Sequence, residues 1–279
     1  MDTSVIEKKF AQMGARVKIA EPRSNRRGDT PPFSIDIRKD EEGDFFDIKI
    51  KKEIDMLVMD VKKDDRHLLL NVKNPENPKA KFLCGHDERA WFTCAIPESA
   101  GASTVFQAKQ ALKPKILRDI ERNEGIKTQN AQKRHRKLAS GRKIHRQGEF
   151  MFIEDPTFKC SEKFPNIIHK NEPMSRGGRS KPHMAEVLYR SGGTTVYVSN
   201  YNSQTQNGLS TAEYNELLRK DPVAKSVNWQ TRKANAVVYV KGRITHSDHK
   251  TLELGDTWYR VELNTEGKAI AVGQVRFLD

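Results

Sequence analysis

Short runs in which apolar and polar residues alternate are the feature that most limits the fold of this chain. A period of two is the period of a β-strand with one buried face. Between residues 33 and 97 such runs recur roughly every ten residues, with turn residues between them. They occupy residues 34–38, 45–51, 53–61, 67–72, 81–84 and 91–96. This pattern predicts an antiparallel sheet that closes into a barrel or a sandwich.

A second group of strand-like runs follows residue 147. These runs occupy residues 148–155, 194–199, 236–245, 251–254, 258–263 and 270–277. Helical spacing of apolar residues instead predicts helices over residues 3–13, 104–123, 183–190 and 210–219. Pro114 interrupts the second of these helices. Ser210 and Glu213 form a capping-box pattern at the start of the last one.

Together these elements predict an α+β protein with two β-rich, barrel- or sandwich-like units joined by a helix and a basic connector. A chain of 279 residues is long for one core and sufficient for two. The expected divisions are an N-terminal helix and basic linker at 1–32, a β-rich domain at 33–100, a helix plus basic connector at 101–147, and an α+β domain with a C-terminal antiparallel sheet at 148–279.

The formal net charge of +13 is concentrated in the middle of the chain. Residues 1–100 carry 19 basic and 19 acidic side chains, residues 101–190 carry 20 and 9, and residues 191–279 carry 11 and 9. The middle third therefore holds +11 of the +13. An excess confined to one part of a chain indicates a polyanionic partner for that part.

The densest part of this excess is residues 127–146, here called the basic segment, which contains no acidic residue. Its cations are Lys127, Lys133, Arg134, Arg136, Lys137, Arg142, Lys143 and Arg146. Its only large apolar residues are Leu138 and Ile144, so we expect the segment to be mobile until a ligand orders it. A glycine-containing loop with Arg176, Arg179 and Lys181 extends the positive track.

The leading hypothesis is a nucleic-acid-binding protein that holds the RNA or DNA backbone through its basic middle third. It would be a subunit of a ribonucleoprotein or of a mobile-element complex, with other protein subunits as further partners. Two other interpretations of the basic segment remain open, a solvated linker without a ligand and a nuclear-import signal. A further alternative is a non-catalytic assembly protein whose connector binds an acidic protein.

Histidine and acidic residues in turns between strands suggest a second chemistry. Two imidazoles and a carboxylate at residues 246–249 suit a divalent metal ion. The candidate ligands or acid–base groups are His86, Asp87, His183, Glu186, His246, Asp248 and His249, with His246, Asp248 and His249 as the candidate metal set. Brought together, they would support a metal-dependent hydrolase or nuclease. The same histidines would also serve as structural turn residues or as donors to phosphate.

Several absences narrow the classes of protein. The sequence has no GxxxxGK[ST], GxGxxG, HExxH or GxSxG pattern, which argues against nucleotide-driven motors, dinucleotide enzymes and serine hydrolases. No cofactor is expected other than a divalent zinc, manganese or magnesium ion. Three cysteines without a CxxC pair favour a reducing compartment. We therefore expect a soluble protein with no membrane partner, in the cytoplasm, or in the nucleus if the cell is eukaryotic.

Overall fold

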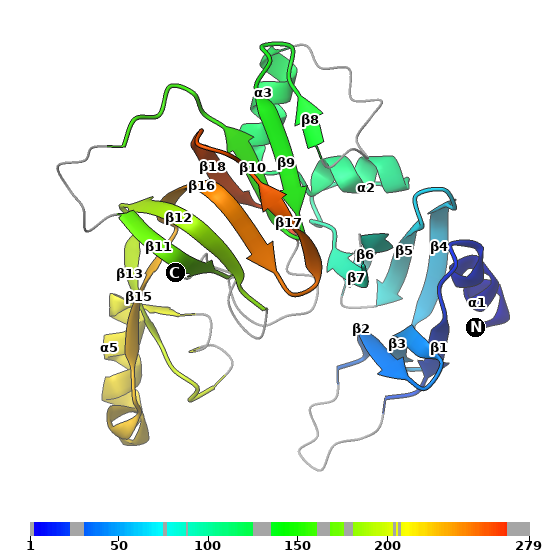
Figure 1. Cartoon of the computed structure of the whole chain (residues 1–279). Helices are drawn as coiled ribbons and strands as arrows, with labels where there is room; N and C mark the ends of the chain where they lie inside the picture. The colour runs from blue at the N-terminus through cyan, green and yellow to red at the C-terminus, as the bar shows by residue number, and fades with distance from the viewer. Residues whose placement is uncertain are drawn as a thin grey trace. The chain divides into compact units, whose positions relative to one another are not determined.

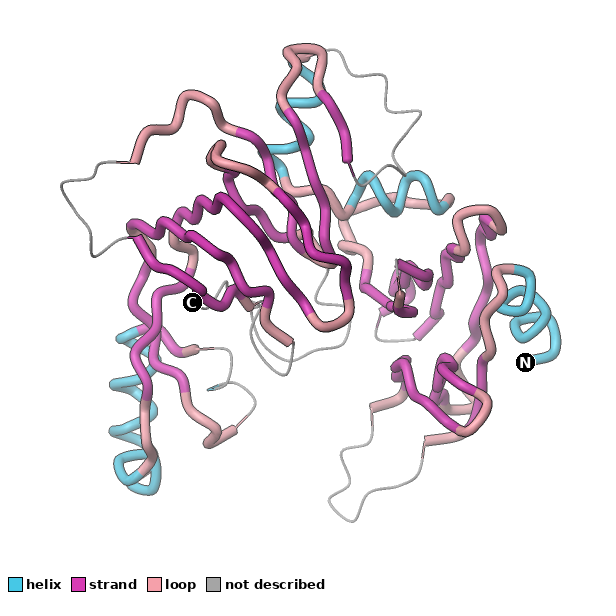
Figure 2. The backbone as a smooth tube through the Cα atoms, in the orientation of Figure 1, coloured by secondary structure: helices cyan, strands magenta, loops and turns pink. Residues whose placement is uncertain are grey.

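The computed structural model of the 279-residue chain describes two compact units. The described residues are 3–22, 31–74, 77–87, 89–124, 135–160, 168–175, 181–202, 205 and 208–266. Unit 1 comprises those up to Lys113 together with Thr265 and Glu266, and unit 2 comprises those from Pro114 to Asn264. The predicted segment 101–147 is divided between the two units at Lys113. Strands make up most of the regular structure in both, as Figure 2 shows.

The described part of unit 1 contains two helices and two sheets (Figure 1). Its sheets have the strand orders β1-β3-β2 and β4-β5-β6-β7, and every described pairing is antiparallel except that of β1 with β3. The elements are α1 Thr3–Gln12, β1 Val17–Ala20, β2 Phe33–Asp40, β3 Gly43–Ile50, β4 Asp55–Lys62, β5 His67–Asn74, β6 Asn77–Asp87, β7 Ala90–Ala95 and α2 Val105–Ala111.

Apolar side chains from α1 and from both sheets form the main core of unit 1. Fully buried Phe46 of β3 lies edge-on to Phe10 of α1 and to Trp91 of β7, with ring centroids 5.0 and 5.6 Å away. Phe33 of β2 and Phe82 of β6 make a third aromatic contact at 5.1 Å. The Phe46–Trp91 and Phe33–Phe82 pairs join the two sheets, because each takes one member from each sheet, and the Phe10–Phe46 pair joins α1 to them.

Unit 2 is built on an eight-stranded antiparallel sheet with the order β11-β12-β16-β18-β10-β9-β8, in which β17 also pairs with β16. A smaller sheet, β14-β13-β15, carries α5 (Figure 1). The elements are α3 Lys115–Asn123, β8 His135–Lys137, β9 Lys143–Gln147, β10 Phe150–Glu154, β11 Ile168–Met174, β12 His183–Ser191, β13 Thr194–Val198, β14 Leu209–Ser210, α5 Thr211–Lys220, a 3-10 helix Pro222–Ser226, β15 Gln230–Ala234, β16 Val237–His246, β17 His249–Glu253 and β18 Tyr259–Leu263.

The α+β class and the two β-rich units are confirmed, although the described strands do not close into a barrel. The capping box at the start of α5 is present, since the Ser210 hydroxyl accepts from the Glu213 amide and the Glu213 carboxylate accepts from the Ser210 amide. Pro114 separates α2 from α3, as expected. The strand predicted at 270–277 lies outside the described residues.

The helix predicted over 183–190 is wrong, because these residues form strand β12. A β-bulge shifts the pairing with β16 between Ala185 and Val187. The bulge changes which residues face the core, so His183, Ala185 and Leu188 are buried. Spacings of two and then three residues resemble a helical period, and this resemblance explains the error.

The second half of the basic segment forms part of unit 2 rather than a free connector. Residues 135–137 and 143–147 form the β8–β9 hairpin at the edge of the large sheet. Leu138 and Ile144 are only 3% exposed, and they pack in one cluster with Leu117 of α3 and Met151 of β10. The expectation of a mobile segment is therefore wrong for these residues, because α3 supplies the apolar partners that the segment lacks. Residues 127–134 of the segment lie outside the described part.

Candidate functional site

Three histidines from three strands of unit 2 meet at one point, and they are called here the histidine triad. His183 begins β12, His246 ends β16 and His249 begins β17. Because β12 and β16 are antiparallel neighbours with Met184 opposite Thr245, the start of one lies beside the end of the other. His246 and His249 are cross-strand partners at the β16–β17 turn. The sheet topology therefore brings the three side chains together.

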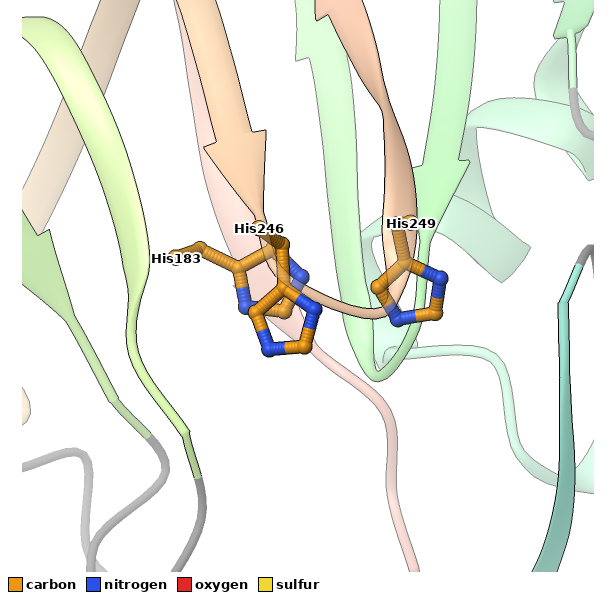
Figure 3. Close-up of side chains that lie close together, drawn as sticks. All are labelled: His183, His246 and His249. Atoms are coloured by element: carbon orange, nitrogen blue, oxygen red, sulfur yellow. The ribbon is translucent and has the colours of Figure 1, made fainter.

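The imidazoles of the triad lie close enough to share one ligand (Figure 3). One ring nitrogen from each lies within 4.8 Å of those from the other two. The ring centroid of His183 is 4.2 Å from that of His246 and 5.6 Å from that of His249, and the last two are 4.8 Å apart. Imidazoles bound tetrahedrally to zinc at about 2.1 Å place their nitrogens about 3.4 Å apart, so the nitrogens of the triad would move at most about 1.4 Å closer to bind one ion.

His183 is the buried member of the triad, because only 1% of this residue is exposed to solvent. Neither of its ring nitrogens has a hydrogen-bond partner within the described part of the chain. Burial, followed by the neighbouring imidazoles of His246 and His249, lowers the pKa of His183 to about 3. The ring is therefore neutral near pH 7, and its lone pair is available to a ligand.

Hydrogen bonds orient the ring of His246. Its Nδ1 accepts from the backbone amide of Asp248 at 3.1 Å. In that tautomer Nε2 carries the proton, and it lies 3.3 Å from the carbonyl oxygen of Lys181. A histidine that ligates a metal ion usually donates its other N–H to a carbonyl or carboxylate. Ligation through Nδ1 would replace the hydrogen bond from the Asp248 amide and would keep the Lys181 carbonyl as the acceptor for Nε2–H.

The turn between β9 and β10 packs against the triad at Gly148. This residue has φ +58°, and a Cβ there would lie 3.0 Å from Nε2 of His249 and 3.5 Å from the ring of His183. A side chain at this position would be strained and would crowd the ring of His249, while it would only touch that of His183. The adjacent Gln147, which is 2% exposed, donates from Nε2 to the carbonyl oxygen of Lys250 at 2.6 Å. This bond ties the turn to strand β17.

Asp248 and Glu186, two of the predicted acidic candidates, form ion pairs in unit 2. The Asp248 carboxylate accepts from Lys181 Nζ at 2.8 Å, and this hydrogen bond is the largest cause of its lowered pKa. The Glu186 carboxylate accepts from Arg243 Nε at 3.1 Å. Glu186 therefore does not join the triad. The cluster contains His183 in the place that the sequence pattern gave to Asp248.

His86 and Asp87, the other predicted candidates, lie in unit 1. They occupy the end of β6, where the ring of His86 lies edge-on to Trp91 with centroids 4.9 Å apart. Asp87 is 7% exposed. Sequence reasoning did not single out Gln147 or Gly148. Gly148 lies between the cationic strand β9 and the aromatic strand β10, and this position indicated a tight turn. The neighbouring sequence did not indicate that the turn lies beside histidines far along the chain.

The predicted nucleic-acid-binding residues differ in their surroundings. Lys127, Lys133, Arg134, Arg176 and Arg179 lie outside the described residues, and Arg136 is described only through its backbone. Lys137 and Lys143 are exposed and are direct cross-strand partners in the β8–β9 hairpin. Arg142 instead donates from Nε to the Glu154 carbonyl oxygen at 2.9 Å. That cation therefore supports the fold.

Two further predicted cations lie near the triad. Arg146 donates from Nη1 to the carbonyl oxygen of Gly148 at a long 3.5 Å. Lys181 pairs with Asp248, and its carbonyl oxygen faces His246. The cations of the basic middle third therefore do not form one uniform surface. Among the predicted binding residues with described side chains, Lys137 and Lys143 are exposed on the hairpin, Arg142 bonds the backbone, and Arg146 and Lys181 lie beside the histidines.

Comparison with protein-family models, with curated proteins and with solved structures gave no match to this chain. Its functional interpretation therefore depends on its own residues. Among the residues that the structure describes, the helices are too short and too polar to cross a membrane.

Proposed function

We propose that unit 2 is a metal-dependent hydrolytic module that holds one divalent ion between His183, His246 and His249. The observation that carries this proposal is that His183 is buried and that neither of its ring nitrogens has a hydrogen-bond partner among the described residues. A buried polar group without a hydrogen bond costs on the order of 1–3 kcal/mol, and native proteins rarely leave one without a reason. Two neighbouring imidazoles beside these nitrogens supply the reason, since together they make a metal-ligand set.

The ligand types favour a particular class of ion. Imidazole suits zinc, copper, iron and nickel, whereas magnesium and manganese prefer carboxylate oxygens. Because Asp248 is paired with Lys181, the triad favours an ion of the zinc class over magnesium or manganese. Three protein ligands also leave a coordination position open, as in catalytic rather than structural zinc sites.

A water at the open position gives the module its chemistry. A zinc-class ion lowers the pKa of bound water to about 7 and so supplies hydroxide near neutral pH. Hydrolysis there consumes one water: the hydroxide oxygen bonds to the electrophilic atom, the bond to the leaving group breaks, and the proton goes to the leaving group. An imidazole that ligates an ion is uncharged, so three such ligands would hold the ion without cancelling its charge.

Metal content tests this proposal directly. The full-length protein is stripped with chelator, dialysed against Zn²⁺ and analysed by elemental mass spectrometry. We expect one zinc ion per chain in the wild type. In His246→Ala the affinity for zinc should fall by more than about 100-fold. Loss of a residue that supports a ligand typically costs 10–100-fold in metal affinity, and loss of the ligand itself should cost more. His169→Ala, which removes a histidine from β11 of the same sheet, is the matched control. No bound zinc in the wild type, or unchanged binding in His246→Ala, would overturn the proposal.

A second candidate function is nucleic-acid binding through the basic middle third. The specific observation is the pairing of exposed Lys137 with exposed Lys143 across β8 and β9. Like charges directly opposite each other destabilise a sheet, and a polyanion removes that cost. The excess of 20 basic over 9 acidic side chains in residues 101–190 supports the same partner.

Neutralising the basic segment is expected to remove this binding. A variant with Lys133, Arg134, Arg136 and Lys137 all changed to Gln should lose affinity for mixed RNA and DNA in fluorescence anisotropy at moderate salt. The double variant Lys137→Gln/Lys143→Gln should lower the slope of log affinity against log salt by about 2, roughly one per phosphate contact.

The matched control for that double variant is Lys225→Gln/Lys233→Gln, which removes two exposed lysines of unit 2 that lie outside the basic middle third. An unchanged slope in the hairpin variant would contradict the prediction. Purified protein with a normal ratio of absorbance at 260 and 280 nm, and a stoichiometric acidic protein partner, would favour the assembly role instead.

A further inference from the structure

We infer that the open position of the histidine centre takes a phosphate oxygen, and that the phosphate belongs to a nucleic-acid strand held along the β8–β9 hairpin. This inference rests on the proposed metal centre and names its substrate class. It joins two features of unit 2, the neutral ligand set of the triad and the cationic strand that leads to it.

The ligand set determines which exogenous ligand the centre prefers. Three neutral imidazoles contribute no charge, so a divalent ion keeps its full +2. A carboxylate ligand would cancel part of that charge, but the nearest acid of the turn, Asp248, is neutralised by Lys181 at 2.8 Å. An ion with uncompensated charge at a partly buried site attracts an anionic ligand strongly, because opposite charges interact more in a low dielectric.

Strand β9 connects the exposed lysines with the histidines. Lys143 and Gln147 share one face of this strand, because side chains alternate along it. Gln147 donates to the carbonyl oxygen of Lys250, next to His249, and a Cβ at Gly148 would lie 3.0 Å from the ring of His249 and 3.5 Å from that of His183. One strand therefore runs from a like-charged lysine pair to the triad.

The spacing along β9 suits a short oligonucleotide. From Lys143 to Gly148 an extended chain spans about 16 Å. About five stacked nucleotides cover the same length. A strand whose phosphates contact Lys137 and Lys143 therefore reaches the histidines with a phosphate a few nucleotides away. Arg146, whose guanidinium lies at the Gly148 carbonyl, adds positive charge at that end.

Free orthophosphate offers the same oxygen ligand, so the test compares the two sources. The full-length protein is loaded with Co²⁺, whose visible absorption reports changes at the coordination sphere. The oligonucleotide is a single-stranded 12-mer without a terminal phosphate, so that all its phosphates are phosphodiesters. We expect it to change this spectrum at a concentration about 100-fold lower than orthophosphate does, because its contacts with the lysines add to its contact with the metal. Lys137→Gln/Lys143→Gln should remove that advantage while leaving Co²⁺ affinity unchanged.

The outcomes separate this inference from the proposed function. A bound Co²⁺ whose spectrum responds to neither phosphate source overturns the inference and leaves the metal centre standing. Equal potency of orthophosphate and the 12-mer in the wild type overturns the nucleic-acid source. Failure of Co²⁺ to bind at all overturns the metal centre itself, and the inference with it. Lys225→Gln/Lys233→Gln should behave as the wild type in every titration.

Discussion

The metal-stripped protein is expected to melt at a temperature about 5–10 °C higher when Zn²⁺ is added at 100 times its dissociation constant. At that ratio a ligand that binds only the folded state adds about 2.7 kcal/mol. In domains of this size each kcal/mol raises the melting temperature by about 2–4 °C. Differential scanning calorimetry with and without Zn²⁺ measures the shift, and His246→Ala should show almost none.

The variant His183→Leu tests whether His183 itself is responsible for the stabilisation by Zn²⁺. In chelator the variant should be as stable as the wild type or more stable, because it replaces a buried imidazole without hydrogen bonds by an apolar side chain of similar size. In Zn²⁺ it should lose the stabilisation entirely. If His183 is a metal ligand, its side chain should lower the stability of the metal-free protein and raise that of the Zn²⁺-bound protein.

The contrary result for His183→Leu is equally clear. If the variant is destabilised by more than about 2 kcal/mol in chelator, His183 has a packing or bonding role of its own, as most damaging core substitutions do. If it keeps the Zn²⁺ response, His183 is not a ligand. His169→Leu should keep both the wild-type stability and the wild-type response, and it controls for the loss of a histidine.

Most strands were predictable from the sequence because their side chains alternate between core and solvent. In β2, Ile35 and Ile37 pack against the core of unit 1, whereas Asp36 and Arg38 are exposed. Strands without that alternation were missed. Residues 230–233 of β15 are all exposed, and β1 is short and parallel to β3. In such strands the partner strand, rather than local pattern, determines the structure.

The histidine triad was only partly predictable. His246 and His249 are three residues apart in one turn, so the sequence indicated them together. His183 lies far away in the chain, and the bulge in β12 gave its surroundings a helical spacing. Only the antiparallel pairing of β12 with β16 brings it to the turn. Asp248 was a reasonable ligand by spacing, yet the lysine that pairs with it also lies distant in sequence.

Replacing Phe46 with alanine is expected to lower the free energy of unfolding of unit 1 by about 3–5 kcal/mol, the usual range for a buried phenylalanine. The ring is fully buried and contacts both Phe10 and Trp91. Its removal leaves a cavity where α1 and the two sheets meet, and it also removes two aromatic contacts. Hydrogen exchange of the β5 amides reports the opening of unit 1 in the full chain.

The position of Phe46, rather than its size alone, is responsible for this effect. Phe106→Ala removes the same number of atoms from α2, but that side chain belongs to a residue 41% exposed, so the cost should stay within about 0.5 kcal/mol. A loss of less than about 1 kcal/mol in Phe46→Ala would mean that the sheets of unit 1 do not depend on this ring. The Phe33–Phe82 contact would then be the one that joins them, and Phe33→Ala would carry the larger penalty.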